Sequence, residues 1–171
     1  MVKAIWILFY GIVALAVQGI LGHLGVSDSL IPQLLVILVV SLSFAEANAF
    51  GCVMSFVMGL LLDFSSAILI GPWAGSFVVL FCALALLSRR LFIDSGMAAM
   101  VITFGSVVVT NVLSSLLGTE YPVLTWEYPQ KVLGQALVTA LIAPVVLSIL
   151  ARRVRRSSSP LITRGNAMSV V

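Results

Sequence analysis

The chain has 171 residues, of which 61% are hydrophobic and only 9% are charged, and its mean hydropathy is +1.23. A soluble domain carries about 25% charged residues, so this chain has too few charges for a polar exterior. The composition therefore excludes an ordinary soluble fold and predicts an all-α, polytopic integral membrane protein. The net charge of +3 does not indicate a nucleic-acid partner, because the arginines lie beside apolar segments.

Six apolar segments predict a bundle of six transmembrane helices, since a bilayer core needs about 20 apolar residues per helix and thinner regions accept fewer. The predicted spans are residues 4–22, 31–45, 49–70, 72–88, 97–117 and 130–151. The first span follows Lys3 as in a signal peptide, but no small-x-small cleavage site ends it, so we expect a retained anchor. Together these spans form one transmembrane domain, residues 1–151.

The distribution of basic residues predicts that both termini are cytoplasmic. If the amino terminus lies inside, every Lys and Arg except Lys131 falls on the inner side, as the positive-inside rule requires. Arginines that flank the spans are also expected to contact anionic lipid headgroups: Arg89, Arg90, Arg152, Arg153, Arg155 and Arg156. Residues 152–171 lose hydrophobic periodicity, which predicts a basic, disordered cytoplasmic tail.

Two stripes of small or polar residues mark helix faces that should pack closely, because small side chains let helix backbones approach each other in lipid. In the third span the stripe recurs at steps of four and consists of Gly51, Ser55 and Gly59. We expect it to pack on a neighbouring helix or to receive the transmembrane helix of a partner. The fifth span carries Thr103, Ser106, Thr110 and Ser114. This second stripe predicts packing inside the bundle or, alternatively, the lining of a substrate cavity.

Asp63 is an isolated carboxylate inside an apolar segment. A charge at the bilayer centre costs about 2.5 to 3.5 kcal/mol on insertion scales, so Asp63 is expected to face the bundle or lie near a membrane surface. Gly71 and Pro72 break the chain shortly after it. We therefore expect Asp63 to accept hydrogen bonds from backbone donors around that turn. The alternative, a proton or ion carrier, would need further ionisable partners, and the central parts of the other spans contain none.

No catalytic, metal or cofactor site is expected. The sequence lacks HExxH, GxSxG, a phosphate-binding loop with Lys and a pair of intramembrane aspartates. Cys52 and Cys82 lie in apolar segments without a CxxC pattern, and they are interpreted as small hydrophobic residues. The sequence thus favours a protein that is not an enzyme.

Between residues 30 and 90 the order of motifs resembles the bacterial rod shape-determining protein MreD family. A proline opens the second span, a Gly-Leu-Leu-x-Asp motif ends the third, a glycine follows, and two arginines close the fourth. The residues that carry the resemblance are Pro32, Gly59, Leu60, Leu61, Asp63, Gly71, Arg89 and Arg90. The rest of the chain agrees in length, hydropathy and expected topology.

The resemblance implies a non-catalytic scaffold of the bacterial inner (cytoplasmic) membrane that helps to maintain cell shape and to position peptidoglycan synthesis. Implied partners are an MreC-like single-span protein, RodA with a class B penicillin-binding protein, and MreB filaments, bound directly or through intermediaries. The implied fold is similar to the six-helix substrate-binding subunits of energy-coupling-factor (ECF) vitamin transporters. That similarity supplies the alternative function, a vitamin-binding transport subunit.

Overall fold

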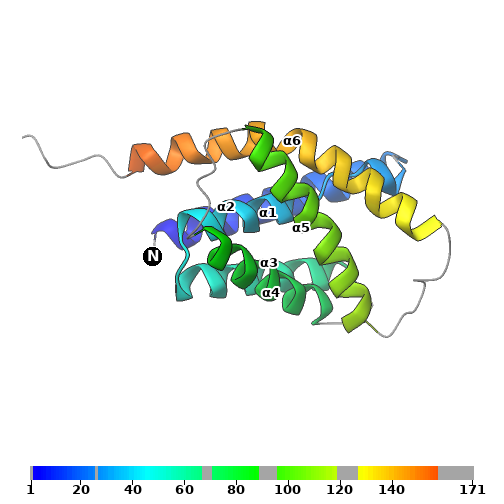
Figure 1. The fold of residues 1–171 in the computed structure, drawn as a ribbon, viewed down its shortest axis with the longest axis horizontal. Helices are drawn as coiled ribbons and strands as arrows, with labels where there is room; N and C mark the ends of the chain where they lie inside the picture. Colours follow the sequence, from blue (N-terminus) through cyan, green and yellow to red (C-terminus); the bar gives the residue numbers. More distant parts are fainter. Residues whose placement is uncertain (1, 26, 67–70, 89–95, 119–126, 158–171) are drawn as a thin grey trace, which may run out of the picture.

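A computed structural model describes residues 2–25, 27–66, 71–88, 96–118 and 127–157. Within these ranges the chain forms six α-helices and one short 3-10 helix, and none of the described residues is in a strand. The elements are α1 (Val2–His23), η1 (Asp28–Leu30), α2 (Leu34–Ala45), α3 (Ala49–Ser66), α4 (Pro72–Ser88), α5 (Gly96–Leu117) and α6 (Glu127–Ser157). Figure 1 shows them packed as a helical bundle, which confirms the predicted all-α class.

Helix α2 forms the centre of the bundle. It contacts every other α-helix, and eight of its 12 residues are buried. Twelve residues reach only about 18 Å, which is less than the ~30 Å hydrocarbon core of a bilayer. The helix begins at Leu34 rather than at the predicted residue 31, because Gln33 has non-helical dihedral angles after Pro32. A short helix at this place therefore serves as the core on which the longer helices pack.

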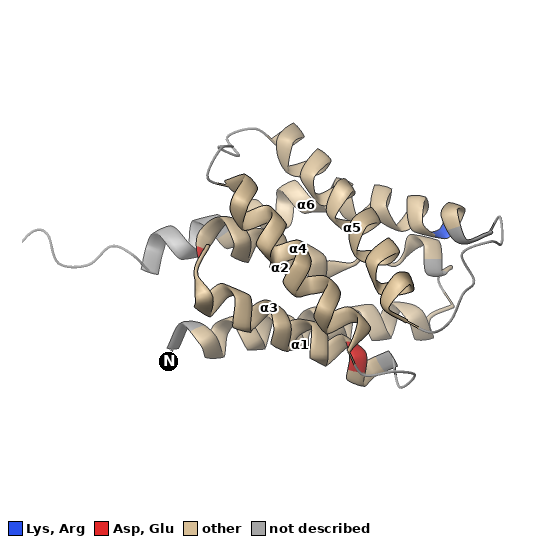
Figure 2. Cartoon of the chain, turned by 60° about the horizontal axis from the view of Figure 1, so that its bottom comes forward, with Lys and Arg blue, Asp and Glu red and all other residues tan. Residues whose placement is uncertain are grey.

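Among the residues that the structure describes, three helices are long and apolar enough to cross a membrane: Ala4–His23, Gly96–Leu117 and Pro129–Leu150. The other three, Leu34–Ala45, Ala49–Ser65 and Pro72–Ser88, are shorter apolar helices. The large apolar side chains on the outside of α1, α5 and α6 are exposed, as expected of surfaces that face lipid. The charged positions drawn in Figure 2 lie near helix ends, whereas the middle of the described bundle is uncharged. These features are those of an integral membrane protein.

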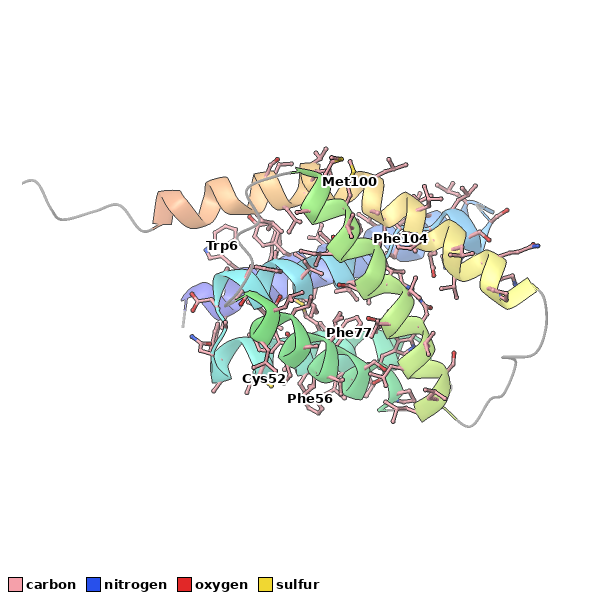
Figure 3. The ribbon with its side chains drawn as sticks, viewed as in Figure 1. Trp6, Cys52, Phe56, Phe77, Met100 and Phe104 are labelled. Carbon is pink, nitrogen blue, oxygen red and sulfur yellow. The ribbon has the colours of Figure 1, made fainter. Side chains whose placement is uncertain are left out.

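Two extensive helix pairs flank α2, namely α3 with α4 and α5 with α6. Between them lies an apolar core that includes Met58, Phe77, Leu80 and Val107. Figure 3 shows Phe77 in the interior, whereas Phe56 projects from the outer face of α3 and is 44% exposed.

Helix α6 differs from its predicted bounds at both ends. It begins at Glu127 and continues to Ser157, so the backbone of residues 152–157 is helical, although the sequence placed these residues in the tail. Residues 158–171 lie outside the described residues. The same holds for residues 67–70, the last part of the predicted third span. The division into a transmembrane domain and a disordered tail stays a prediction.

Candidate functional site

Asp63, near the end of α3, caps the amino terminus of α4. Its side chain is 1% exposed, and it accepts three hydrogen bonds from backbone N–H groups. The donors are Gly71 and Ala74 to Oδ2, both at 3.0 Å, and Trp73 to Oδ1 at 3.1 Å. Because the first N–H groups of a helix have no partner within the helix, a carboxylate at this place satisfies them and matches the positive end of the helix dipole. This is the hydrogen-bonding role that the sequence predicted for Asp63.

Gly71 and Pro72, at the start of α4, favour this cap. Gly71 has a φ of +128°, a conformation that residues with a side chain rarely adopt. Pro72 is the first residue of α4, and it has no N–H group that would need an acceptor. The carboxylate therefore meets every N–H group between Gly71 and Ala74. Both of its oxygens are engaged, which favours a structural role over the ion-carrier alternative.

The stripe of Gly51, Ser55 and Gly59 is occupied by α4 of the same chain. All three residues are buried. A side-chain carbon on Gly59 would run into the backbone of Ala74 and would lie 2.8 Å from the carbonyl oxygen of Trp73. A carbon on Gly51 would meet the ring of Phe81 at 2.7 Å. The stripe packs on a neighbouring helix, and the expectation that it receives a partner helix is not supported, because α4 already fills this face.

The polar stripe of α5 faces the bundle interior. Thr103, Ser106 and Thr110 are buried, and Ser114 is partly buried. Three of the four hydroxyls donate to carbonyl oxygens of their own helix: Ser106 to Ile102, Thr110 to Ser106, and Ser114 to Asn111. Such bonds satisfy hydroxyls without a ligand, which favours the packing interpretation of this stripe.

A second polar cluster, which sequence reasoning missed, joins α2, α5 and α6. The backbone N–H of Gln33 donates to Thr139 Oγ1 at 2.9 Å. The side-chain Nε2 of Gln33 donates to Gln135 Oε1 at 2.9 Å and to Asn111 Oδ1 at 3.4 Å. Gln18 of α1 donates to the carbonyl oxygen of Pro32 at 2.9 Å. Amide side chains inside apolar spans were the available signal, but Gln33 lies 78 positions from Asn111 and 102 positions from Gln135.

Several residues singled out in the sequence cannot be placed at a site. Arg89 and Arg90 lie outside the described residues. Arg152, Arg153, Arg155 and Arg156 belong to the last turns of α6. Their contact with anionic lipid stays a prediction. Leu60 and Leu61 are partly buried in α3, next to the glycine and the aspartate of their motif. In the described part of the chain, no three His, Cys, Asp or Glu side chains gather at one place that could hold a metal ion.

No curated protein and no solved structure matches the chain significantly, so the similarity to ECF substrate-binding subunits stays a prediction. The family model described as rod shape-determining protein MreD matches residues 1–153. The matched region contains the Asp63 cap, the stripe on α3 and the Gln33 cluster. Because the match extends over most of its length, the chain belongs to the MreD family.

Proposed function

We propose that this protein is a non-catalytic, multi-pass scaffold of the bacterial inner (cytoplasmic) membrane that binds partner transmembrane proteins of the cell-elongation complex. In this role it helps to maintain rod shape and to position peptidoglycan synthesis. The proposed direct partner is an MreC-like single-span protein. RodA, a class B penicillin-binding protein and MreB filaments would join the same complex, MreB directly or through intermediaries. Membership in the MreD family supports the role in rod shape.

The proposal that the protein is not a catalyst rests on Asp63, whose carboxylate is engaged in hydrogen bonds within the fold. It is the only ionisable Asp, Glu, Lys, Arg or His side chain among the buried residues that the structure describes. Its two oxygens accept three backbone hydrogen bonds, so the carboxylate is used as a cap. General acid–base catalysis needs a titratable group within reach of a substrate. A scaffold needs only surfaces, and this chain offers long apolar ones.

Helix α1 is the surface that we propose for the partner helix. Only 11% of its membrane-length window is buried, compared with 28% for α5 and for α6. The rings of Trp6, Phe9 and Tyr10 form a cluster with centroids 6.1 Å apart. Trp6 is 51% exposed and lies at the periphery of the bundle (Figure 3). An aromatic cluster on a lightly covered helix offers a large contact area to another transmembrane helix.

Site-specific photocrosslinking in living cells tests this proposal. A photoreactive residue is placed at Ile12 of α1, and matched controls carry it at Val101 of α5 or Leu141 of α6, which are also exposed apolar positions. We expect an adduct with a single-span MreC-like protein from Ile12 and none from the two controls. Adducts of equal yield from all three positions, or from the controls alone, would contradict the assignment to α1.

The six arginines that flank the spans support a second, weaker contact, with anionic lipid. Arg152, Arg153, Arg155 and Arg156 lie in the last turns of α6, just beyond its membrane-length apolar part, and juxtamembrane basic residues are attracted to anionic headgroups. Replacing these four by Gln is expected to weaken pull-down with phosphatidylglycerol vesicles and to leave binding to neutral vesicles unchanged. An unchanged preference for anionic vesicles would show that these arginines do not contribute to lipid recognition.

A further inference from the structure

A short strap, defined as Ser29–Gln33, covers one end of the bundle between α1 and α2. It lies directly on α6: a side-chain carbon on Gly134 would stand 3.1 Å from both the Cβ and the carbonyl oxygen of Ser29. Such a distance is shorter than most carbon contacts in proteins. The strap therefore depends on a glycine at position 134 for its present place.

Hydrogen bonds from three sides hold the strap. Gln18 of α1 donates to the carbonyl oxygen of Pro32, and the N–H of Gln33 donates to Thr139 of α6. The side chain of Gln33 adds bonds to Gln135 and Asn111. All of these are bonds between uncharged groups, each of which contributes modestly because water can replace it. Among the apolar side chains of the strap, Leu30 is 56% exposed and anchors little, whereas Ile31 is partly buried and Pro32 is buried.

The closed arrangement is incompletely satisfied. Gln18 Oε1 and Gln33 Oε1 are shielded from solvent, and neither has a hydrogen-bond partner among the described residues. Gln33 as a whole is only 8% exposed. A buried carbonyl oxygen without a donor is unfavourable relative to the same oxygen in water. Opening the strap would hydrate both oxygens, and this gain offsets part of the loss of the bonds that hold it.

We propose that the Ser29–Gln33 strap is a gate that opens and closes over the polar face formed by Asn111, Gln135 and Thr139. In the closed state Gln33 covers this face, and in the open state the face is accessible to water at that end of the bundle. The proposal does not rest on the partner contact along α1, although Gln18 of that helix helps to hold the strap closed. In this proposal, the polar cluster around Gln33 holds the strap closed, and its hydrogen bonds break when the strap opens.

Residue-resolved hydrogen exchange of the wild-type protein in nanodiscs measures the gate directly. The Gln33 amide can exchange only when its bond to Thr139 breaks. The matched reference is the Ala74 amide, which is also a buried helix-start amide held by a side-chain acceptor. We expect the Gln33 amide to exchange on the order of a hundredfold faster than the Ala74 amide, corrected for sequence effects. Equal protection of the two amides would overturn the gate.

A pair of glycine variants provides the second measurement. Gly134→Ala adds a carbon against Ser29, whereas the matched Gly19→Ala adds one where no atom lies within 4 Å. We expect Gly134→Ala to speed exchange at Gln33 about tenfold, the population change that corresponds to losing one uncharged hydrogen bond, and to leave Ala74 unchanged. Gly19→Ala should change neither. An unchanged Gln33 rate in a folded Gly134→Ala protein would contradict the proposal, and the wild-type comparison stands if that variant does not fold.

Discussion

The N–H group of Ala74 donates to Asp63 Oδ2 over 3.0 Å, and the same alanine lies against Gly59, one turn earlier on α3. Gly59 allows the backbone of α4 to approach, and Asp63 then caps the helix that has approached. The Gly-Leu-Leu-x-Asp motif of residues 59–63 is therefore a single device that joins α3 to α4. This relationship explains why the glycine and the aspartate occur four residues apart on one helix face.

Removing the cap should destabilise the fold in a graded way. Asp63→Asn keeps one acceptor oxygen but brings an NH₂ group toward N–H donors, so we expect a loss of about 1 to 3 kcal/mol. Asp63→Leu leaves three N–H groups without an acceptor, of which that of Ala74 is buried and the other two are partly buried, and a loss of about 3 to 5 kcal/mol follows. Thermal unfolding in detergent should show melting temperatures in the order wild type, Asn, Leu. Ser65→Ala is the control, because the Ser65 hydroxyl donates to Leu62 of its own helix at an exposed position.

If both Asp63 variants have the same melting temperature as the Ser65→Ala control and support normal cell shape, the cap does not contribute to stability. If Asp63→Asn is fully stable but inactive in cells, the carboxylate has a chemical role and the structural assignment is wrong.

An alanine at position 59 should lower the stability of the fold, whereas an alanine at position 105 should leave it unchanged or raise it. Alanine is favoured over glycine in helices by about 1 kcal/mol, so Gly105→Ala, with no atom within 4 Å of the new carbon, should be neutral or stabilising. Gly59→Ala places that carbon against the Ala74 backbone and should cost about 1 to 3 kcal/mol by overpacking. For a chain of this length each kcal/mol corresponds to about 2 to 4 °C of melting temperature. Equal melting temperatures would show that α4 can move away without cost.

The Thr139 hydroxyl should matter because it accepts a hydrogen bond from outside its own helix, from the N–H group of Gln33. Thr139→Val removes the acceptor of the Gln33 N–H group, and we expect a loss of about 1 to 2 kcal/mol. Thr139→Ser keeps the hydroxyl and should retain most of the stability. Thr110→Val is the matched control, because the buried Thr110 hydroxyl donates within α5. A Thr110→Val protein that is as unstable as Thr139→Val would assign the effect to buried hydroxyls in general.

Hydropathy located all six helices, because apolar runs in this chain are separated by Gly, Pro and polar residues. It misjudged where α2 begins, since Gln33, which follows Pro32, has non-helical dihedral angles. It also stopped α6 at residue 151, although the arginines that follow are compatible with a helix that continues beyond the apolar part. Hydropathy identifies the apolar part of a helix, but a helix can continue beyond the point where its residues stop being apolar.

Local spacing was informative for the Asp63 site and uninformative for the Gln33 cluster. Asp63 bonds to donors 8 to 11 residues away, and the Gly71-Pro72 break marked where those donors would lie. The stripe at Gly51, Ser55 and Gly59 identified a packing face, but periodicity cannot say whether the neighbour is the same chain or a partner. Gln33 meets Asn111 and Gln135 only because the start of α2 converges with α5 and α6. No spacing rule in one sequence specifies such a meeting.

Affinity capture from native membranes tests the scaffold proposal most directly. The tagged protein is extracted in mild detergent, and co-purifying proteins are identified by mass spectrometry against an untagged control. We predict recovery of a single-span MreC-like protein together with RodA and a class B penicillin-binding protein. Recovery of ATPases and a coupling subunit, without cell-wall synthases, would contradict the account and would identify a vitamin-transporter component.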